Sequence, residues 1–182
     1  SVASFADYFA SAEGETVRFP TDDDLRREIA SRPQYGAIQQ KRLRHILGAL
    51  ERASRDDGDE SVDLRDDLWI EHILPESWMA HWPLPDGANA PADLETGVTE
   101  SMRVHIVERQ ALKHTLGNLT LLTSTKNPEL GNLAFEGKKD WLRRSLLKMN
   151  QDVALLDKWD EAAIRNRAAT LCDLATRIWP HP

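Results

Sequence analysis

Two short segments, far apart in the chain, place polar side chains inside apolar runs. The first is IEHILP at 70–75, and the second is LGNLTLLTSTKN at 116–127. The first contributes a glutamate next to a histidine, and the second contributes Asn118 and Asn127. Taken singly, these residues have ordinary explanations, because a charged residue in an apolar run is usually held in an ion pair. Taken together, a histidine, a carboxylate and two amides suit the hydrolysis of a phosphodiester.

Each of these four side chains fits one task in that chemistry. His72 supplies a base that is neutral near pH 7 and can activate water. Glu71 and Asn127 supply oxygen ligands for a hard cation, Mg²⁺ or Mn²⁺, and their low total charge leaves room on the cation for phosphate oxygens and water. Asn118 can donate and accept hydrogen bonds at once, so we expect it to tie the loop after the histidine to the second segment.

The neighbouring positions of Glu71 and His72 create a geometric difficulty. Successive side chains of a regular strand point to opposite faces, so the two cannot both face one metal ion from an ideal strand. Pro75 follows closely, and proline is tolerated at strand ends and bulges. We therefore expect the strand to fray or bulge here. A Glu71 side chain directed away from His72 and Asn127 would contradict its assignment as a ligand.

The elements that must position these residues are mostly helical. Apolar residues at helical spacing, together with capping and stop signals, predict five helices. Their ranges are 21–31, 38–55, 99–115, 136–149 and 160–179. Short apolar runs at 68–75 and 117–123 predict two strands, separated by an irregular, proline-rich stretch at 81–93. The predicted fold is mainly α, in the α+β class, with a two-stranded hairpin held by packing against helices.

Composition sets further limits on function. The 182 residues carry a net charge of −7, which argues against a protein that coats nucleic acid. Residues 101–182 nevertheless hold 13 basic against 9 acidic side chains, so phosphate contact is expected there. The single cysteine, Cys172, excludes an internal disulfide and a cysteine-rich zinc site, and it favours a cytoplasmic protein with a buried thiol. No membrane span or signal peptide is expected, and the start at Ser1 suggests a piece of a longer protein.

The ordered motifs resemble those of a nuclease family. EHILP, then HTLGNLTLL from His114 and KN at 126–127, followed by NLAFEGK ending at Lys138, resemble the HNH (ββα-metal) nucleases. The resemblance is closer to the C-terminal nuclease domain of GmrSD-type modification-dependent restriction enzymes, a group that includes antiphage proteins. It covers about residues 66–180, so we divide the chain into an N-terminal helical segment, 1–65, and an HNH-type nuclease domain, 66–182.

The resemblance implies roles for particular residues. His72 activates water, Glu71 and Asn127 bind the metal, and Asn118 is the structural middle residue of the triplet. His114 and Lys138 match positions that either support a catalytic side chain or hold a phosphate. Zinc-stabilised HNH proteins carry paired CxxC motifs, which a chain with one cysteine cannot form. The helices must therefore hold the hairpin.

These observations favour a metal-dependent DNA endonuclease domain that nicks one strand at a time. Cutting both strands would require a dimer or two events. The resemblance also implies an N-terminal NTPase domain in the same polypeptide that senses modified DNA, although these residues contain no P-loop. Two alternatives stay open: a catalytically silent helical module that binds DNA or protein, and a nuclease that acts on RNA.

Overall fold

The fold is mainly helical, with one small sheet among the helices. The computed structural model describes residues 7–8, 11, 18–55, 64, 68–91, 93–94, 96–122 and 133–181. Its helices are α2 (Asp22–Ser31), α3 (Gln40–Ala53), α4 (Glu100–Leu112), α6 (Phe135–Arg143), α7 (Lys148–Ala154) and α8 (Glu161–Ile178). Strands β1 (Trp69–His72) and β2 (Leu119–Leu122) form the two-stranded sheet of the described residues. The mainly helical fold with a hairpin is therefore confirmed.

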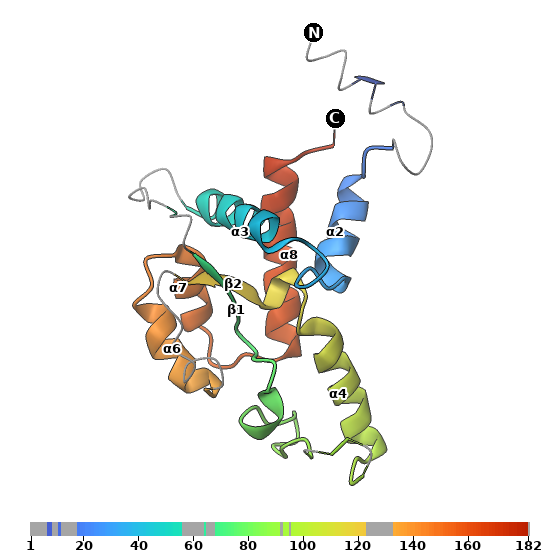
Figure 1. The fold of residues 1–182 in the computed structure, drawn as a ribbon, viewed down its shortest axis with the longest axis vertical. Helices are drawn as coiled ribbons and strands as arrows, with labels where there is room; N and C mark the ends of the chain where they lie inside the picture. Colours follow the sequence, from blue (N-terminus) through green and yellow to red (C-terminus); the bar gives the residue numbers. More distant parts are fainter. Residues whose placement is uncertain are drawn as a thin grey trace.

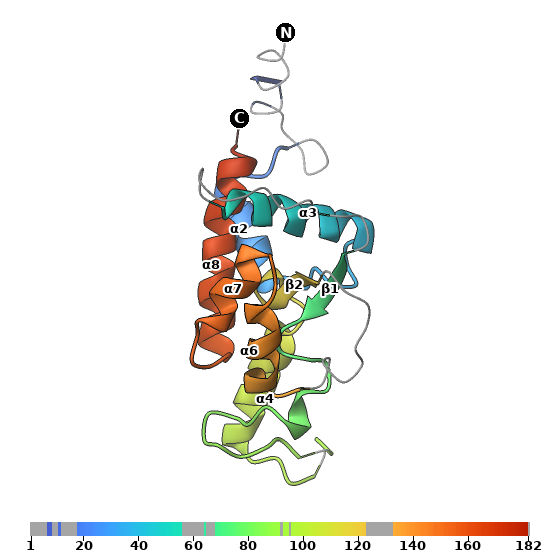
Figure 2. The same ribbon diagram turned by 90° about the vertical axis from the view of Figure 1, so that its left-hand side faces the viewer.

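Helix α8 forms the axis of the molecule (Figure 1). Helices α2 and α3 pack against its C-terminal half, α4 lies near its N-terminal half, and the hairpin with α6 and α7 lies on one side. A view turned by 90° shows α3 crossing above the hairpin while α6 and α7 run beside α8 (Figure 2). The hairpin is thus enclosed by helices drawn from both ends of the chain.

Local sequence signals explain where α2 begins. The Thr21 hydroxyl accepts a hydrogen bond from the Asp24 N–H at 3.1 Å, and the Asp24 carboxylate accepts one from the Thr21 N–H at 3.0 Å. This reciprocal cap satisfies two N–H groups that the helix itself leaves free. The bonds from Thr21 hold the pKa of Asp24 down at about 2, with Arg18 and Arg27 adding to the effect. The expected helix start is confirmed.

The two strands pair antiparallel in a regular register. Trp69 lies opposite Leu122, and His72 lies opposite Leu119. Of the two expected departures near His72, a fray or a bulge, the described hairpin has no bulge: the pairing is unbroken from Trp69 to His72, and the strand ends there. Glu71 and His72 consequently keep the opposite orientations of a regular strand.

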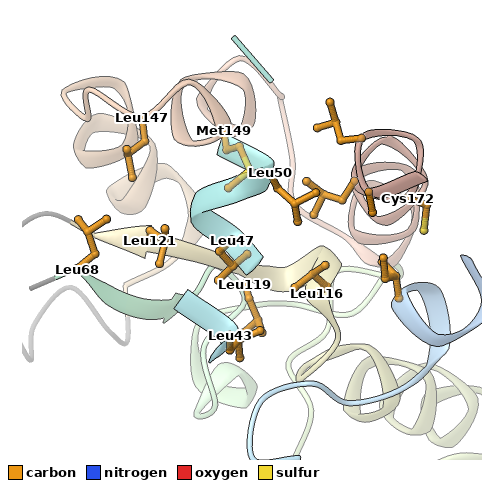
Figure 3. Close-up of a cluster of buried hydrophobic side chains, with 14 residues drawn as sticks. Leu43, Leu47, Leu50, Leu68, Leu116, Leu119, Leu121, Leu147, Met149 and Cys172 are labelled. Atoms are coloured by element: carbon orange, nitrogen blue, oxygen red, sulfur yellow. The ribbon is translucent and has the colours of Figure 1, made fainter. Parts of the chain in front are cut away.

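Leucines of α3 and β2 form the part of the core that supports the hairpin. Leu43, Leu47 and Leu50 of α3 lie over Leu119 and Leu121 of β2 (Figure 3). All five side chains are fully buried. Cys172 of α8 lies in the same cluster, and burial raises the pKa of its thiol, as expected for a small buried hydrophobe. The expectation that helices hold the hairpin is confirmed by this packing.

The predicted helix at 136–149 is wrong in one respect, because the chain breaks it into α6 and α7. The cause is Glu51 of α3, whose fully buried carboxylate accepts hydrogen bonds from the N–H groups of Lys148 and Met149 at 2.8 and 2.9 Å. A carboxylate at a helix N-terminus satisfies free N–H groups and opposes the positive end of the helix dipole. Leu146, in the break, is 69% exposed instead of lying on an apolar helix face.

The irregular segment after β1 is fixed by a buried arginine. The Arg109 guanidinium of α4 donates to the Trp82 carbonyl at 2.7 Å and forms an ion pair with Glu161 at the start of α8. It also lies over the ring of the fully buried Trp78, 4.7 Å from the centroid. This contact set ties the segment to two helices and so fixes the chain that leaves the end of β1.

Candidate active site

His72 occupies the last position of β1 and is only 8% exposed. The edge of its ring meets Tyr35, with 4.5 Å between centroids and an interplanar angle of 70°. Its Nε2 lies 3.0 Å from Nδ1 of His114, which follows α4. One of these two nitrogens must carry the hydrogen that joins them. The imidazole is therefore held between an N-terminal loop and the turn that leads into β2.

The surroundings of His72 keep its ring neutral. Burial is the main reason that the pKa of His72 falls to about 3, and His114, Lys138 and Lys113 add to the effect. Desolvation and nearby positive charge both disfavour an imidazolium. A neutral ring retains a lone pair near pH 7, although a base of such low pKa is intrinsically weak. An approaching phosphate anion would raise this pKa, since opposite charge favours the protonated form.

Asn118 connects the loop after His72 to the turn before β2. Its Oδ1 accepts from the Leu74 N–H at 2.8 Å, and its Nδ2 donates to the Leu74 carbonyl at 2.9 Å. Nδ2 also donates to the Lys113 carbonyl at 2.8 Å, and Oδ1 accepts from the Trp159 indole at 3.0 Å. Asn118 is fully buried with every amide hydrogen-bonding direction in use. These contacts are those of a positioning residue.

Glu71 points to the other side of the hairpin, where Lys138 of α6 lies. The Lys138 ammonium donates to Glu71 Oε1 at 2.9 Å and to the His72 carbonyl at 2.7 Å. Lys138 is 2% exposed, and burial lowers its pKa while Glu71 opposes that shift. The phosphate contact considered for Lys138 would require this ion pair to open. In the structure Lys138 instead fixes Glu71 and the end of β1.

The metal-ligand assignment of Glu71 depends on Asn127, which lies outside the described residues. Glu71 Oε2 makes no hydrogen bond to any described residue, so one carboxylate oxygen stays available to a cation. The carboxylate is half-buried, with its side chain 27% exposed. The carboxylate lies on the other side of β1 from His72, as alternation requires. This is one of the two conditions that would contradict its assignment as a ligand, and the other is its direction relative to Asn127. The pairing of Glu71 with Asn127 stays a prediction.

A third group, which sequence reasoning missed, lies beside the two histidines. Donor atoms of His72, His114 and Glu76 all lie within 4.8 Å of one another, close enough to share one metal ion. Glu76 is exposed and follows the histidine by four positions. Burial lowers the pKa of His114, with Lys113 adding to the effect and Glu76 opposing it. No periodicity in the sequence connects Glu76 to His114, since a turn and a helix separate them.

Tyr35 is another neighbour that the sequence did not reveal. Its ring stacks on His114, with centroids 5.8 Å apart and an interplanar angle of 13°. The N–H groups of Gln34 and Tyr35 both donate to the His114 carbonyl, at 2.9 and 3.2 Å. The loop between α2 and α3 therefore forms one wall of the histidine pair. A contact between residues so far apart in the chain carries no local sequence signal.

A comparison with protein families identifies the class of module to which this site belongs. The model for the C-terminal domain of GmrSD restriction endonucleases matches residues 19–174. The chain belongs to this family. The match includes α2 and α3, and so it begins well before residue 66, where the motif resemblance starts. No curated protein sequence matches the chain.

None of the helices in the described part of the chain combines the length and apolar character needed to cross a bilayer. The family and the donor cluster beside His72 together point to a divalent metal. The module is thus of the restriction endonuclease type.

Proposed function

We propose that this chain is a metal-dependent DNA endonuclease module of the HNH type, in which His72 activates the attacking water. The observation that carries the proposal is the placement of a buried, neutral imidazole at the end of β1, with the following loop braced by Asn118. A neutral histidine can accept the proton of a water molecule as that water attacks phosphorus. Family membership supports DNA as the substrate.

The residues around His72 divide the remaining tasks. Glu71 and Asn127 are the protein ligands of the cation, and the free Oε2 of Glu71 fits that role. A bound Mg²⁺ or Mn²⁺ would neutralise charge that develops on the phosphate oxygens. Lys138 sets the position of the Glu71 carboxylate through its ion pair. Asn118 holds the backbone of Leu74, and this fixes the loop after His72.

One site per chain performs one displacement, so the product is a nick. The resemblance to HNH nucleases implies that the nick has 5′-phosphate and 3′-hydroxyl ends. Cleavage of both strands needs two chains or two events. In the whole protein, an N-terminal NTPase domain that senses modified DNA would bring this acidic module to its substrate. Tethering raises the local concentration of DNA, so weak intrinsic affinity suffices.

Nicking of supercoiled plasmid tests the proposal. Wild-type protein with Mg²⁺ or Mn²⁺ should convert plasmid to the open-circular form, and His72→Ala and Asn127→Ala should lose at least 100-fold in rate. His81→Ala, which removes an exposed histidine from the loop after β1, serves as the matched control and should retain activity. Circular dichroism confirms that each variant is folded.

The same reactions discriminate the alternatives. A silent binding module would show no metal-dependent nicking from the wild type at any protein concentration. An RNA-directed nuclease would cut a structured RNA under the same metal conditions faster than it cuts plasmid. Full activity of a folded His72→Ala variant would contradict the assignment of the base.

A further inference from the structure

The nitrogen donors beside β1 differ in kind from the proposed oxygen ligands. His72 Nε2 and His114 Nδ1 lie 3.0 Å apart, and a carboxylate oxygen of Glu76 lies within 4.8 Å of both. Glu71 has its side chain on the opposite side of the strand, held by Lys138. Glu71 and the nitrogen donors therefore lie on different faces of β1, and His72 belongs to the nitrogen-rich set.

The distance between the two nitrogens suits a shared ion. Imidazole nitrogens bind Zn²⁺ at about 2.0–2.1 Å, which places two of them roughly 3.3–3.4 Å apart in tetrahedral geometry, so the two rings need to separate by only a few tenths of an ångström. A hydrogen bond between His72 and His114 accounts for the same distance, but it does not account for a carboxylate approaching the same point. Glu76 is exposed, so its side chain can close the remaining gap without disturbing the core. Two imidazoles and a carboxylate form a ligand set found in catalytic zinc sites.

Rigid contacts hold the two histidines in place before any ion arrives. His72 is the paired end of β1, and the His114 carbonyl accepts from the N–H groups of Gln34 and Tyr35. The Tyr35 ring contacts both imidazoles. Ligands that are already in position lose little conformational freedom on binding. Glu76 is the one member of the set that must be ordered.

We propose that His72, Glu76 and His114 form a second cation site, selective for a nitrogen-preferring ion such as Zn²⁺, and that its occupation switches the nuclease off. The proposal rests on the proposed function, because it takes His72 to be the base. An ion bound to Nε2 replaces the hydrogen bond to His114 and holds the lone pair that Nε2 would need to accept a proton from water. Mg²⁺ does not compete, since it prefers oxygen ligands in octahedral geometry.

The local charges limit how tightly this site binds. Lys113 and Lys138 lie near the histidines, and their positive charges oppose the binding of a cation there, whereas the carboxylate of Glu76 favours it. Three protein ligands also provide less binding energy than the four of a structural zinc site. Binding should therefore be reversible, so that a chelator restores the free base.

Metal binding is tested directly on the 182-residue chain. Titration with Zn²⁺ by calorimetry, and with Co²⁺ by visible absorption, should show one site per chain in the wild type. Glu76→Gln and His114→Asn should each weaken binding by at least about 10-fold. The matched controls are His81→Asn and Glu100→Gln, an exposed histidine and an exposed glutamate elsewhere. Both controls should bind as the wild type does.

Activity supplies the second measurement. Zn²⁺ should inhibit nicking that is supported by excess Mg²⁺. For Glu76→Gln, the zinc concentration that halves the rate should rise by the same factor as the dissociation constant for zinc. Each variant is compared with its own zinc-free rate. Unchanged zinc binding in both site variants, equal weakening in the controls, or binding without inhibition would each overturn the proposal. Absence of nicking from the wild type would refute the proposed function, while the titrations would still decide whether the site binds metal.

Discussion

Replacement of Asn118 by alanine separates the stability of the hairpin from its chemistry. The substitution deletes four hydrogen bonds. It leaves the Leu74 N–H and the Trp159 indole N–H buried without an acceptor. The Lys113 carbonyl is only partly buried and can turn to water. A buried group left without a partner costs about 1–3 kcal/mol, so two such donors and the lost amide contacts amount to about 3–5 kcal/mol.

A second buried asparagine provides the matched control. Asn150 of α7 is also fully buried, and its Nδ2 donates to the Leu121 carbonyl at 2.9 Å and to the Ser145 hydroxyl at 2.8 Å. Its Oδ1 accepts from the Thr120 hydroxyl. Asn150→Ala should cost about 2–4 kcal/mol by the same reasoning. Asn150 supports the middle of β2, however, and not the loop that follows His72.

Urea unfolding followed by tryptophan fluorescence measures the two costs. With a slope of about 2 kcal/mol per molar urea, the midpoint should fall by roughly 2 M for Asn118→Ala and by somewhat less for Asn150→Ala. Nicking rates per folded molecule should differ far more, with Asn118→Ala losing at least 10-fold and Asn150→Ala staying near the wild type. Equal activities for the two folded variants would refute the idea that Asn118 positions the site.

Three further outcomes follow from the packing and charge of the site. The pKa of His72 is about 3 in the folded chain against 6.5 for a free histidine, so the stability provided by the neutral ring is complete above pH 6.5 and is lost as the pH falls toward 3. Urea melts should show a loss on the order of 2–3 kcal/mol between pH 7 and 4.5 that His72→Gln largely removes. Gly117→Ala should lower the free energy of unfolding by about 2–3 kcal/mol in thermal melts, because the added Cβ would lie 2.5 Å from the Ile164 carbonyl oxygen. Gly48→Ala is the control: its added Cβ would have an ordinary nearest contact of 3.4 Å, so this variant should be neutral or stabilising. Glu51→Gln should cost about 1–2 kcal/mol in urea melts, since it removes the charge that caps α7.

Local signals in the sequence were enough for much of the scaffold. Thr21 and its following acids determine the start of α2, and the apolar runs determine both strands. Asn118 was identified as a brace because an amide both donates and accepts, and its bonds to Leu74 run in both directions. The helix start and the strands depend on residue types that lie close together in the chain, whereas the role of Asn118 follows from the bonding capacity of its amide group.

Features that depend on contacts between distant residues could not be predicted from the sequence. The break between α6 and α7 is set by Glu51, nearly a hundred positions earlier, and no helical period reveals it. The wall that Tyr35 forms beside His114 and the approach of Glu76 to the histidines both depend on how separate elements pack. The roles of Glu71 and Asn127 as ligands stay predictions, because the second of them lies outside the described residues.

The packing of α3 over the hairpin determines the smallest segment in which the nuclease centre can fold. The segment from β1 onward contains the proposed catalytic residues, but the helix that covers its hairpin, α3, lies before it in the chain. Cut away from α2 and α3, it would expose Leu119 and Leu121 to water and free the His114 carbonyl from the N–H groups of Gln34 and Tyr35. Any transfer of the nuclease centre into another protein must therefore carry the helices that precede it, and a domain attached ahead of α2 would be joined to the same helices that cover the site.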